Sequence, residues 1–207
     1  MTASSNIWRC AVPVATVWTS ASSVRDIDAP GVENPVHLVK WLEALPYKER
    51  VDLCNANRIQ TQLLFGEEVI VDEIVNDWAK IVAIHQPSKK DNRGYPGWVP
   101  VTQLKEGGTN KIKNYVIVTA DKVQLWSEDE NPLIVLPFNT ILPLQDECSK
   151  FYHVDTPNGK GLLSKNGVEI TTSSTTGNPT TIDQAVAKGL AFLDLPYLWA
   201  GMSSYGY

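Results

Sequence analysis

The amino-acid sequence predicts a mainly β protein built from two small β-barrels, the first of which contains a helical insertion. Three observations indicate this fold. Short runs of β-branched and aromatic residues are separated by Gly, Asn and Asp turns, which is typical of small barrels. The pattern of the first part recurs, more weakly, in the second. Seven Trp and seven Tyr stand against four Phe, a composition that favours strands and grooves for carbohydrate or peptide.

The first barrel begins with an alternating strand over residues 12–19. A helix is then predicted over residues 35–45, with Asn34 as its N-cap and Pro35 at its first position. Pro46 ends that helix and opens a second over residues 47–55. Strand-like sequence resumes in the runs 62–65, 67–73, 78–84 and 98–100, the last after a Gly/Pro turn at 94–97. We therefore predict a first barrel over residues 8–107, with a helical insertion near residues 34–57.

A second copy of these strands follows. Residues 118–126 resemble 14–18, 136–144 resemble 64–71, 151–154 resemble 78–81, and 161–163 resemble 97–99. Two barrels are favoured over one ten-stranded sheet, because a small barrel closes its own edges. We predict a second barrel over residues 108–170, with the Gly/Asn-rich run 107–110 as the hinge.

The C-terminal part begins with a Ser/Thr/Gly-rich run, predicted to be a linker over residues 171–180. A helix capped at Thr181 or its neighbour then carries an apolar stripe: Ile182, Ala185, Val186, Gly189, Leu190 and Leu193. A single helix of about a dozen residues is marginal in water. We therefore expect it to be poorly ordered or docked on the barrels, and to belong to a domain whose remainder is missing from the 207 residues.

Charge and composition exclude several functions. The net charge is −5 and the longest basic run is Lys89-Lys90, so no nucleic acid partner is expected. No apolar run approaches the roughly 20 residues of a membrane span. The N-terminus lacks the features of an export signal, which indicates a cytoplasmic protein, or an exported one whose signal has been removed. Cys10, Cys54 and Cys148 have no metal-ligand spacing, and we expect buried free thiols in a reducing compartment.

The last eleven residues carry the most specific motif, Tyr-Leu-Trp-Ala-Gly-Met-Ser-Ser-Tyr-Gly-Tyr at 197–207. This run resembles the approach to the nucleophile in the NlpC/P60 cysteine peptidases, in which Tyr-x-Trp-Gly-Gly-x-Ser-x-x-Gly-x precedes Asp-Cys-Ser-Gly. The chain departs from that pattern at Ala200, where the family usually has Gly. The resemblance implies that the chain is truncated just before the catalytic cysteine.

The resemblance extends to the first barrel. Residues 62–67 and 77–80, followed by Gly-Tyr-Pro-Gly-Trp-Val-Pro at 94–100, look like the first bacterial SH3-like (SH3b) barrel of the γ-D-glutamyl-L-diamino-acid endopeptidases. Those enzymes cleave murein peptides and carry two SH3b barrels before their peptidase domain. Residues 181–207 would then be the first helix and the start of an incomplete α+β, papain-like NlpC/P60 domain. No cofactor or metal is implied.

By this resemblance the 207 residues are expected to be inactive, because the nucleophilic cysteine and its histidine are absent. No cysteine of the chain is followed by a serine-glycine pair or a helix start. His37, His85 and His153 are interpreted as structural or merely exposed, because a catalytic histidine needs a partnered nucleophile.

Four residues are candidates for contact with a murein peptide of the L-Ala-γ-D-Glu-diamino acid type. Glu67 and Tyr95 match first-barrel positions that, by resemblance, recognise the free amino terminus; a solvated turn carboxylate and a barrel-rim aromatic are the alternatives. Tyr197 matches an auxiliary position beside the catalytic cysteine, with a core tyrosine as the alternative. Trp199 is a candidate for substrate contact, although packing beneath the nucleophile helix is the stronger interpretation.

Two other functions remain open at this point. The paired barrels could be a non-catalytic SH3b module that binds the cell wall, although such a module has no use for the motif at 197–207. A protein unrelated to murein would require the ordered motifs to be coincidental. Between meso-diaminopimelate and lysine as the diamino acid, the sequence does not choose.

Overall fold

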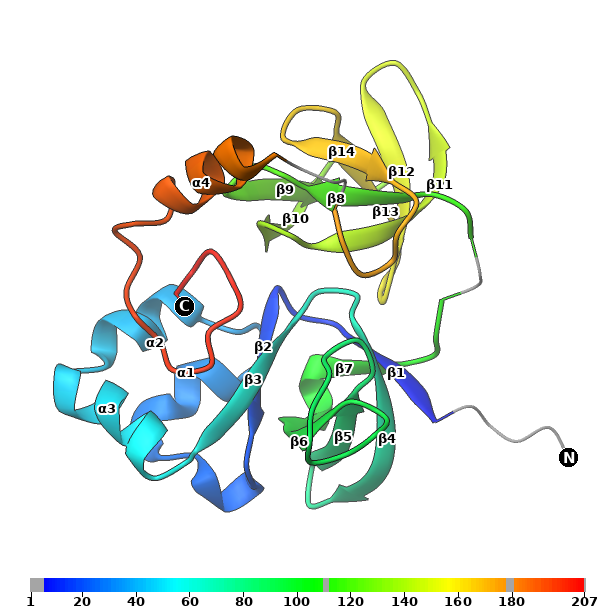
Figure 1. Ribbon diagram of the computed structural model, residues 1–207. Helices are drawn as coiled ribbons and strands as arrows, with labels where there is room; N and C mark the ends of the chain where they lie inside the picture. Colours follow the sequence, from blue (N-terminus) through cyan, green and yellow to red (C-terminus); the bar gives the residue numbers. More distant parts are fainter. Residues whose placement is uncertain (1–5, 110–111, 178–180, 207) are drawn as a thin grey trace, which may run out of the picture.

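The computed structural model describes residues 6–109, 112–177 and 181–206. The fold is mainly β, as predicted, and consists of two seven-stranded antiparallel sheets that follow one another along the chain (Figure 1). The strands of the first sheet are β1 (Ile7–Cys10), β2 (Val14–Trp18), β3 (Ile59–Leu64), β4 (Glu68–Val75), β5 (Trp78–Ala83), β6 (Tyr95–Pro100) and β7 (Leu104–Glu106). Those of the second are β8 (Tyr115–Val118), β9 (Lys122–Trp126), β10 (Pro132–Pro137), β11 (Ile141–Glu147), β12 (Phe151–Thr156), β13 (Gly159–Ser164) and β14 (Val168–Thr171).

The two sheets have the same topology. Their strand orders are β3-β2-β6-β5-β4-β1-β7 and β10-β9-β13-β12-β11-β8-β14, so each strand of the first sheet has its counterpart in the second. The repeat predicted from the sequence pairs the correct strands, including residues 78–81 in β5 with 151–154 in β12. Each sheet encloses a core to which all seven of its strands contribute, because alternate side chains of a strand point to one face.

The domain boundaries predicted from the sequence remain predictions. Asn110, at the end of the predicted hinge, and residues 178–180 of the predicted linker lie outside the described residues, as does Tyr207 of the C-terminal motif.

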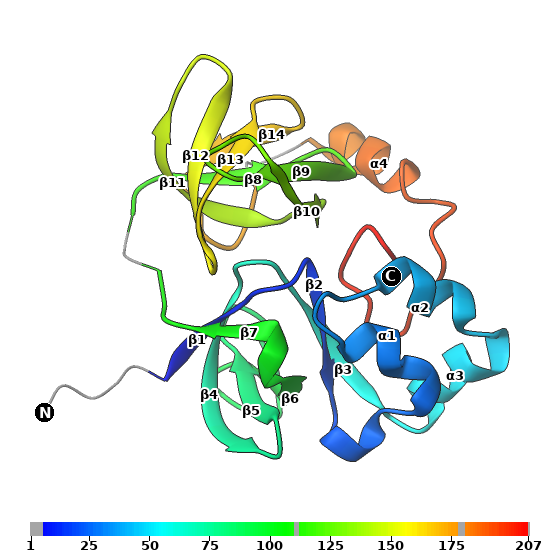
Figure 2. The ribbon, with the colours of Figure 1, turned by 180° about the vertical axis from the view of Figure 1, so that it is seen from behind.

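The helical insertion lies between β2 and β3 and covers their outer face (Figures 1 and 2). Trp18 on β2 and Trp41 in the insertion are both fully buried, with ring centroids 6.0 Å apart. Five consecutive buried residues in β2 follow from this cover, because one face meets the sheet core and the other meets the helices. The insertion comprises η1 (Ala21–Ser23), η2 (Asp26–Asp28), α1 (Ala29–Val32), α2 (Leu38–Ala44) and α3 (Tyr47–Asn55).

Helix α3 has the predicted bounds, residues 47–55 after Pro46. The predicted start of the helix before it, at Pro35, is wrong. Helix α2 begins at Leu38 with His37 as its N-cap residue. Asn34 does not cap this helix, because it lies three residues before the N-cap position. Its side-chain amide instead donates to the Thr102 carbonyl at 2.5 Å, which ties the insertion to the turn between β6 and β7.

A turn of the first sheet is inserted into the core of the second. Phe65, between β3 and β4, is buried among second-sheet residues such as Val116, Leu136 and Leu142. Gly66 follows at φ +87°, and a Cβ there would lie 2.7 Å from Leu142 Cδ2. Glycine is thus needed both for the backbone conformation and for the close approach.

A partly buried ion pair forms a second link between the sheets. Arg9 Nη1 on β1 lies 2.6 Å from Asp155 Oδ2 on β12, and Arg9 Nη2 donates to the Thr156 carbonyl at 3.2 Å. The Phe65 turn and the Arg9 pair together fix how the two sheets meet.

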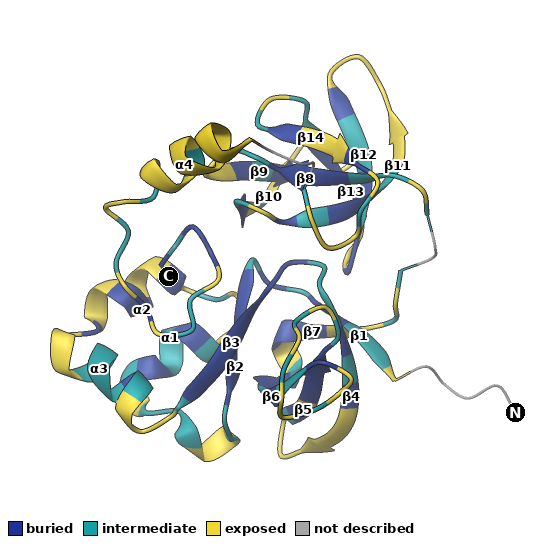
Figure 3. Ribbon diagram, viewed as in Figure 1, coloured by how far each residue is buried: buried dark blue, intermediate teal, exposed yellow. Residues whose placement is uncertain are grey.

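The C-terminal helix α4 (Ile182–Leu190) lies beside the second sheet (Figure 1). Thr181 caps it as predicted, by accepting a hydrogen bond from the Gln184 backbone at 3.3 Å. The docking is slight: the Phe192 and Phe138 rings are 5.2 Å apart, and α4 contains no buried residue. Its apolar stripe faces solvent, as the yellow colouring in Figure 3 shows.

The three cysteines are free. Cys10 is buried as expected, whereas Cys54 is half-buried and Cys148 is exposed. The expectation of buried thiols is therefore wrong for Cys148, which lies in the turn between β11 and β12.

Replacement of Phe65 should destabilise the second sheet although Phe65 belongs to the first. We expect Phe65→Ala to lower the free energy of unfolding by about 3–5 kcal/mol, the usual result of emptying a buried aromatic site. The half-buried Phe138→Ala is the matched control and should lower it by less. Calorimetry should show one transition for the wild type and two for Phe65→Ala; equal, small effects of both variants would contradict the inserted turn.

Candidate active site between the sheets

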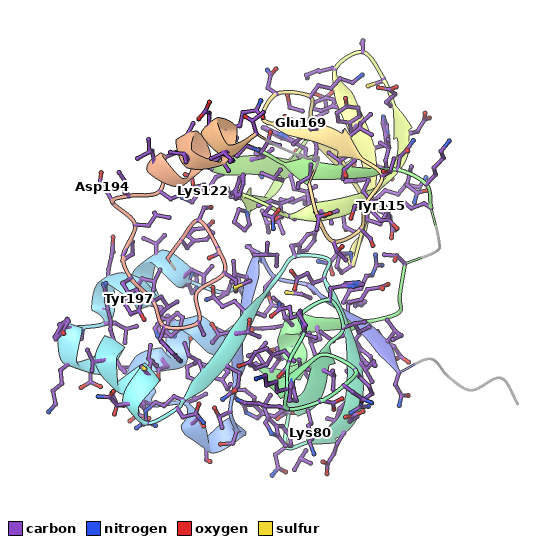
Figure 4. All side chains as sticks on the ribbon, viewed as in Figure 1. Lys80, Tyr115, Lys122, Glu169, Asp194 and Tyr197 are labelled. Atoms are coloured by element: carbon purple, nitrogen blue, oxygen red, sulfur yellow. The ribbon has the colours of Figure 1, made fainter. Side chains whose placement is uncertain are left out.

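A cavity of about 160 Å³ lies where the two sheets meet. Its walls come from the turn before β4, the segment after β5, the second sheet, and the C-terminal motif. Figure 4 labels Tyr115, one of the lining residues, on the side of the second sheet that faces the first. The polar lining residues are Glu67, Glu68, His85, Gln86, Thr109, Tyr115, Asn139, Ser174 and Thr175.

Glu67 is held in this cavity by the inserted turn, because it follows Phe65 and Gly66 directly. Its carboxylate Oε2 accepts a hydrogen bond from Gln86 Nε2 at 3.2 Å. Burial raises the pKa of Glu67 from 4.5 to about 7, although the Gln86 hydrogen bond opposes this shift. The side chain is thus partly protonated at neutral pH, and a cation entering the cavity would favour its charged form.

Gln86 orients this carboxylate and is itself fixed by two further contacts. Its Nε2 also donates to the Gln62 carbonyl at 2.8 Å, and its Oε1 accepts from Thr61 Oγ1 at 2.6 Å. Both partners lie on β3, so the carboxylate is anchored to this strand of the first sheet.

The C-terminal motif enters the same cavity through Met202. The Met202 backbone N–H donates to Gln62 Oε1 at 3.0 Å. Glu67 and Met202 are therefore connected through Gln86 and Gln62, because Gln62 accepts from Gln86 at its backbone carbonyl and from Met202 at its side-chain Oε1. Two sequence features that are 135 positions apart, the predicted specificity carboxylate and the motif, meet at one site.

Leu198 and Ser204 of the motif are buried, Leu198 against the helical insertion and Ser204 against the second sheet. Leu198 packs with Leu42 and Trp41 of the insertion. Ser204 Oγ donates to the Asp121 carbonyl of the second sheet at 2.7 Å and accepts from the Phe138 N–H at 3.3 Å. Residues 198–206 are thus held between the insertion and the second sheet.

Ala200 lies in the left-handed region, at φ +59°. Glycine is the residue best suited to that conformation, which gives a physical reason for the glycine of the family pattern. Ala adopts it here at a cost of about 1–2 kcal/mol.

Tyr197 and Trp199 do not line this cavity. Tyr197 is 64% exposed and Trp199 is 40% exposed. Figure 4 shows Tyr197 beside the helical insertion, on the other side of the molecule from Tyr115. The alternative of a core tyrosine is wrong for Tyr197, because its side chain lies mostly in solvent.

Tyr95 is not among the cavity-lining residues either. It is half-buried against the core of the first sheet, where β6 begins, and Lys90 Nζ lies 5.4 Å from its ring centroid. Because β4 begins at Glu68, β5 ends at Ala83 and β6 begins at Tyr95, Tyr95 and Glu67 lie at the same end of the first sheet.

None of the three cysteines lines this cavity. Burial raises the pKa of the Cys10 thiol to about 12, so that thiol is protonated. Cys148 is exposed on a turn, and hydrogen bonds from the Phe151 and Lys150 backbone and from the His153 side chain lower its pKa. No group of His, Cys, Asp and Glu that could hold a metal ion occurs among the described residues.

Sequence reasoning did not identify the contacts of Gln62, Gln86 and Met202, which connect the cavity to the motif. His85 is exposed, as one of its two interpretations had it, and lines the cavity. One signal in the sequence could have indicated the contact of Gln62 with Met202: Gln62 stands in the strand-like run 62–65, whose other residues are apolar, and a glutamine buried in a strand needs hydrogen-bond partners.

No helix in the described ranges is long and apolar enough to cross a membrane.

Comparison with known proteins adds three findings. Residues 118–170 match the sequence profile of the YKFC SH3b2 domain. Two curated relatives are each named gamma-D-glutamyl-L-lysine dipeptidyl-peptidase. The relative from Bacillus cereus is 37% identical over 202 residues, which cover 95% of this chain and 61% of that protein. The relative from Bacillus subtilis is 34% identical over 194 residues, 94% of this chain and 64% of that protein.

A crystal structure of an NlpC/P60 family protein from Bacillus cereus superimposes with a TM-score of 0.87 at 36% identity. The match covers 97% of this chain and 68% of that one. The chain therefore spans less than two thirds of the length of the two curated relatives, and about two thirds of the crystallised one.

The partly buried carboxylate of Glu67 predicts a pH-dependent effect on stability. Between pH 4.5 and about 7, the folded state holds a proton on Glu67 that the unfolded state has released, so stability falls as pH rises. Glu67→Gln should therefore be more stable than the wild type above pH 7, by up to about 3 kcal/mol, with the difference vanishing below pH 4.5. Denaturant unfolding across this range measures it, with exposed Glu106→Gln as the control; a difference that does not vary with pH would contradict burial as the cause.

Proposed function

This chain belongs to the NlpC/P60 family, and we propose that it is the N-terminal, substrate-selecting part of a murein-peptide endopeptidase. The bond cleaved is the one between γ-D-Glu and the diamino acid, in peptides that begin with a free L-Ala. The names of the two curated relatives, both γ-D-glutamyl-L-lysine peptidases, support this reaction.

One observation carries the proposal: Glu67 and Met202 line the same cavity. Glu67 is the carboxylate expected to bind an amino terminus, and Met202 belongs to the segment that resembles the approach to a nucleophile. An amine held at Glu67 is therefore held beside the place where the peptide bond would be attacked.

The environment of Glu67 suits an ammonium ion. A carboxylate removed from water gains more from a charged hydrogen-bond donor than an exposed one does. Gln86 occupies one carboxylate oxygen, which leaves acceptor capacity on the carboxylate for the substrate. An acylated amino terminus, or a stem peptide still attached to its glycan, has no ammonium. Its binding would bury the Glu67 carboxylate without a cation to pair with it, which is unfavourable.

The remaining candidates have narrower proposed roles. Tyr95, at the same end of the first sheet as Glu67, would supply a second contact to the amino-terminal residue. Tyr197 would assist the nucleophile through its hydroxyl, and Trp199 would contact the part of the peptide outside the cavity. The nucleophile itself would be a cysteine that follows the motif, so residues 1–207 alone should not hydrolyse the peptide.

A free amino terminus occurs on peptides already released from the wall. We therefore propose a cytoplasmic protein that acts on imported murein peptides, with an exported protein as the alternative.

A non-catalytic cell-wall binding module is the second candidate, and the match of residues 118–170 to an SH3b2 domain favours it. Binding of the 207-residue chain to purified peptidoglycan separates the two functions. Retention that does not depend on free amino termini would support the module.

Peptide binding tests Glu67 directly. The 207-residue chain should bind L-Ala-γ-D-Glu-L-Lys at pH 8 in calorimetric titration, and Glu67→Gln should weaken binding by about 10- to 100-fold, the usual loss for a hydrogen bond to a charged group. Binding should also weaken toward pH 5 as Glu67 is protonated. Exposed Glu106→Gln is the matched control.

The N-acetylated peptide tests whether Glu67 recognises the amino group. It lacks the ammonium and should bind the wild type as weakly as the free peptide binds Glu67→Gln. Equal affinity for the acetylated and free peptides would exclude Glu67 as the amine-recognising group.

A further inference from the structure

The C-terminal motif is attached to both sheets by side chains that no family pattern identified. On one side, Gln62 Oε1 accepts the Met202 N–H at 3.0 Å. On the other, Ser204 Oγ donates to the Asp121 carbonyl at 2.7 Å and accepts the Phe138 N–H at 3.3 Å. Both ribbon views show this segment, in red, between the helical insertion and the second sheet (Figures 1 and 2).

Gln62 is unusual because it is a polar side chain in a fully buried strand. It is 1% exposed, and all six residues of β3 are buried. A buried amide without partners is costly, and Gln62 has partners on both sides: Nε2 lies 3.4 Å from Thr16 Oγ1, and Oε1 accepts from Met202. An apolar side chain would fill the strand position but could not accept the Met202 N–H.

Ser204 attaches the next turn of the motif in the same way. It is 4% exposed, and both of its hydrogen bonds reach second-sheet residues more than 60 positions away in sequence. The neighbouring Ser203 is similarly buried, at 6% exposed, yet its Oγ accepts only the local Tyr205 N–H, at 3.4 Å. Burial alone therefore does not explain the contacts of Ser204.

We propose that Gln62 and Ser204 are positioning residues for the reaction, which fix the backbone of residues 202–206 relative to Glu67. The proposal rests on the proposed function. It also assigns a role to the second sheet, which supports the segment leading to the nucleophile rather than binding a cell-wall ligand of its own.

The connection from Glu67 through Gln86 and Gln62 to Met202 would also determine which peptide bond is cleaved. It connects the amine-binding carboxylate to the approach segment through three contacts of 3.2, 2.8 and 3.0 Å. The distance from the bound amine to the attacking atom is then set by the protein, so a constant number of residues is released from the amino terminus.

Amide hydrogen exchange in the 207-residue chain tests the anchoring without reference to catalysis. Gln62→Met should accelerate exchange at Met202 about tenfold, and Ser204→Ala should do the same at Phe138. Gln60→Met, on the same strand, and Ser203→Ala are the matched controls and should leave both amides unchanged. Unchanged exchange at Met202 and Phe138 in the two test variants would overturn the proposal.

Kinetics separate positioning from a merely structural role. In a fusion of residues 1–207 to the part of the Bacillus cereus relative that follows the matched region, Gln62→Met and Ser204→Ala should lower kcat about tenfold with KM unchanged. Glu67→Gln should instead raise KM. If Gln62→Met does not fold, Ser204→Ala decides alone, with rescue by Ser204→Thr, which keeps the hydroxyl.

Failure of the positioning proposal is distinguishable from failure of the proposed function. An unchanged kcat in both variants, with peptide binding still dependent on Glu67, would overturn the positioning role alone. Loss of Glu67-dependent binding would overturn the proposed function, whereas the exchange result would stand on its own.

Discussion

The insertion of Phe65 into the second sheet is the contact on which the rest of this structure depends. It fills a core made by all seven strands of the other sheet, and the close approach at Gly66 leaves no room for a side chain. Glu67 comes next in the chain, so the same turn that joins the two sheets also places the carboxylate in the cavity between them. Arg9 and Asp155 hold the junction from another side. The candidate site therefore forms only when the two sheets pack together.

Glu67 lowers the stability of the folded protein at neutral and higher pH. Burial disfavours its charged form, as the pKa of about 7 indicates, and glutamine would satisfy the Gln86 contact without that cost. Carboxylates that are buried without a cationic partner are characteristic of binding sites that await one. The exposed apolar stripe of α4, with Ile182 at one end and Leu193 beyond the other, is a second feature that does not serve the stability of the described fold.

Much of this architecture could be predicted from the sequence, because it follows from local patterns. The internal repeat identified the equivalent strands, Pro46 set the start of α3, and Thr181 capped α4. What the sequence could not provide were contacts between distant segments. Asn34 resembled a helix cap, but its side chain bonds Thr102 in the turn between β6 and β7. The link from Gln62 to Met202 spans 140 positions, and no periodicity indicates it. Tyr95 and Trp199 were assigned by resemblance, which specifies positions in a motif but not whether a side chain reaches the cavity, and neither lines it.

The central claim is that the cavity between the sheets binds the free amino terminus of a murein peptide at Glu67, beside the motif that contains Met202. A crystal structure of the 207-residue chain with L-Ala-γ-D-Glu tests it most directly. The account predicts the amino nitrogen within about 3 Å of a Glu67 carboxylate oxygen, as in a charged hydrogen bond, and the γ-carboxyl directed toward Met202. A dipeptide bound at any other surface, or one with its amino group away from Glu67, would contradict it.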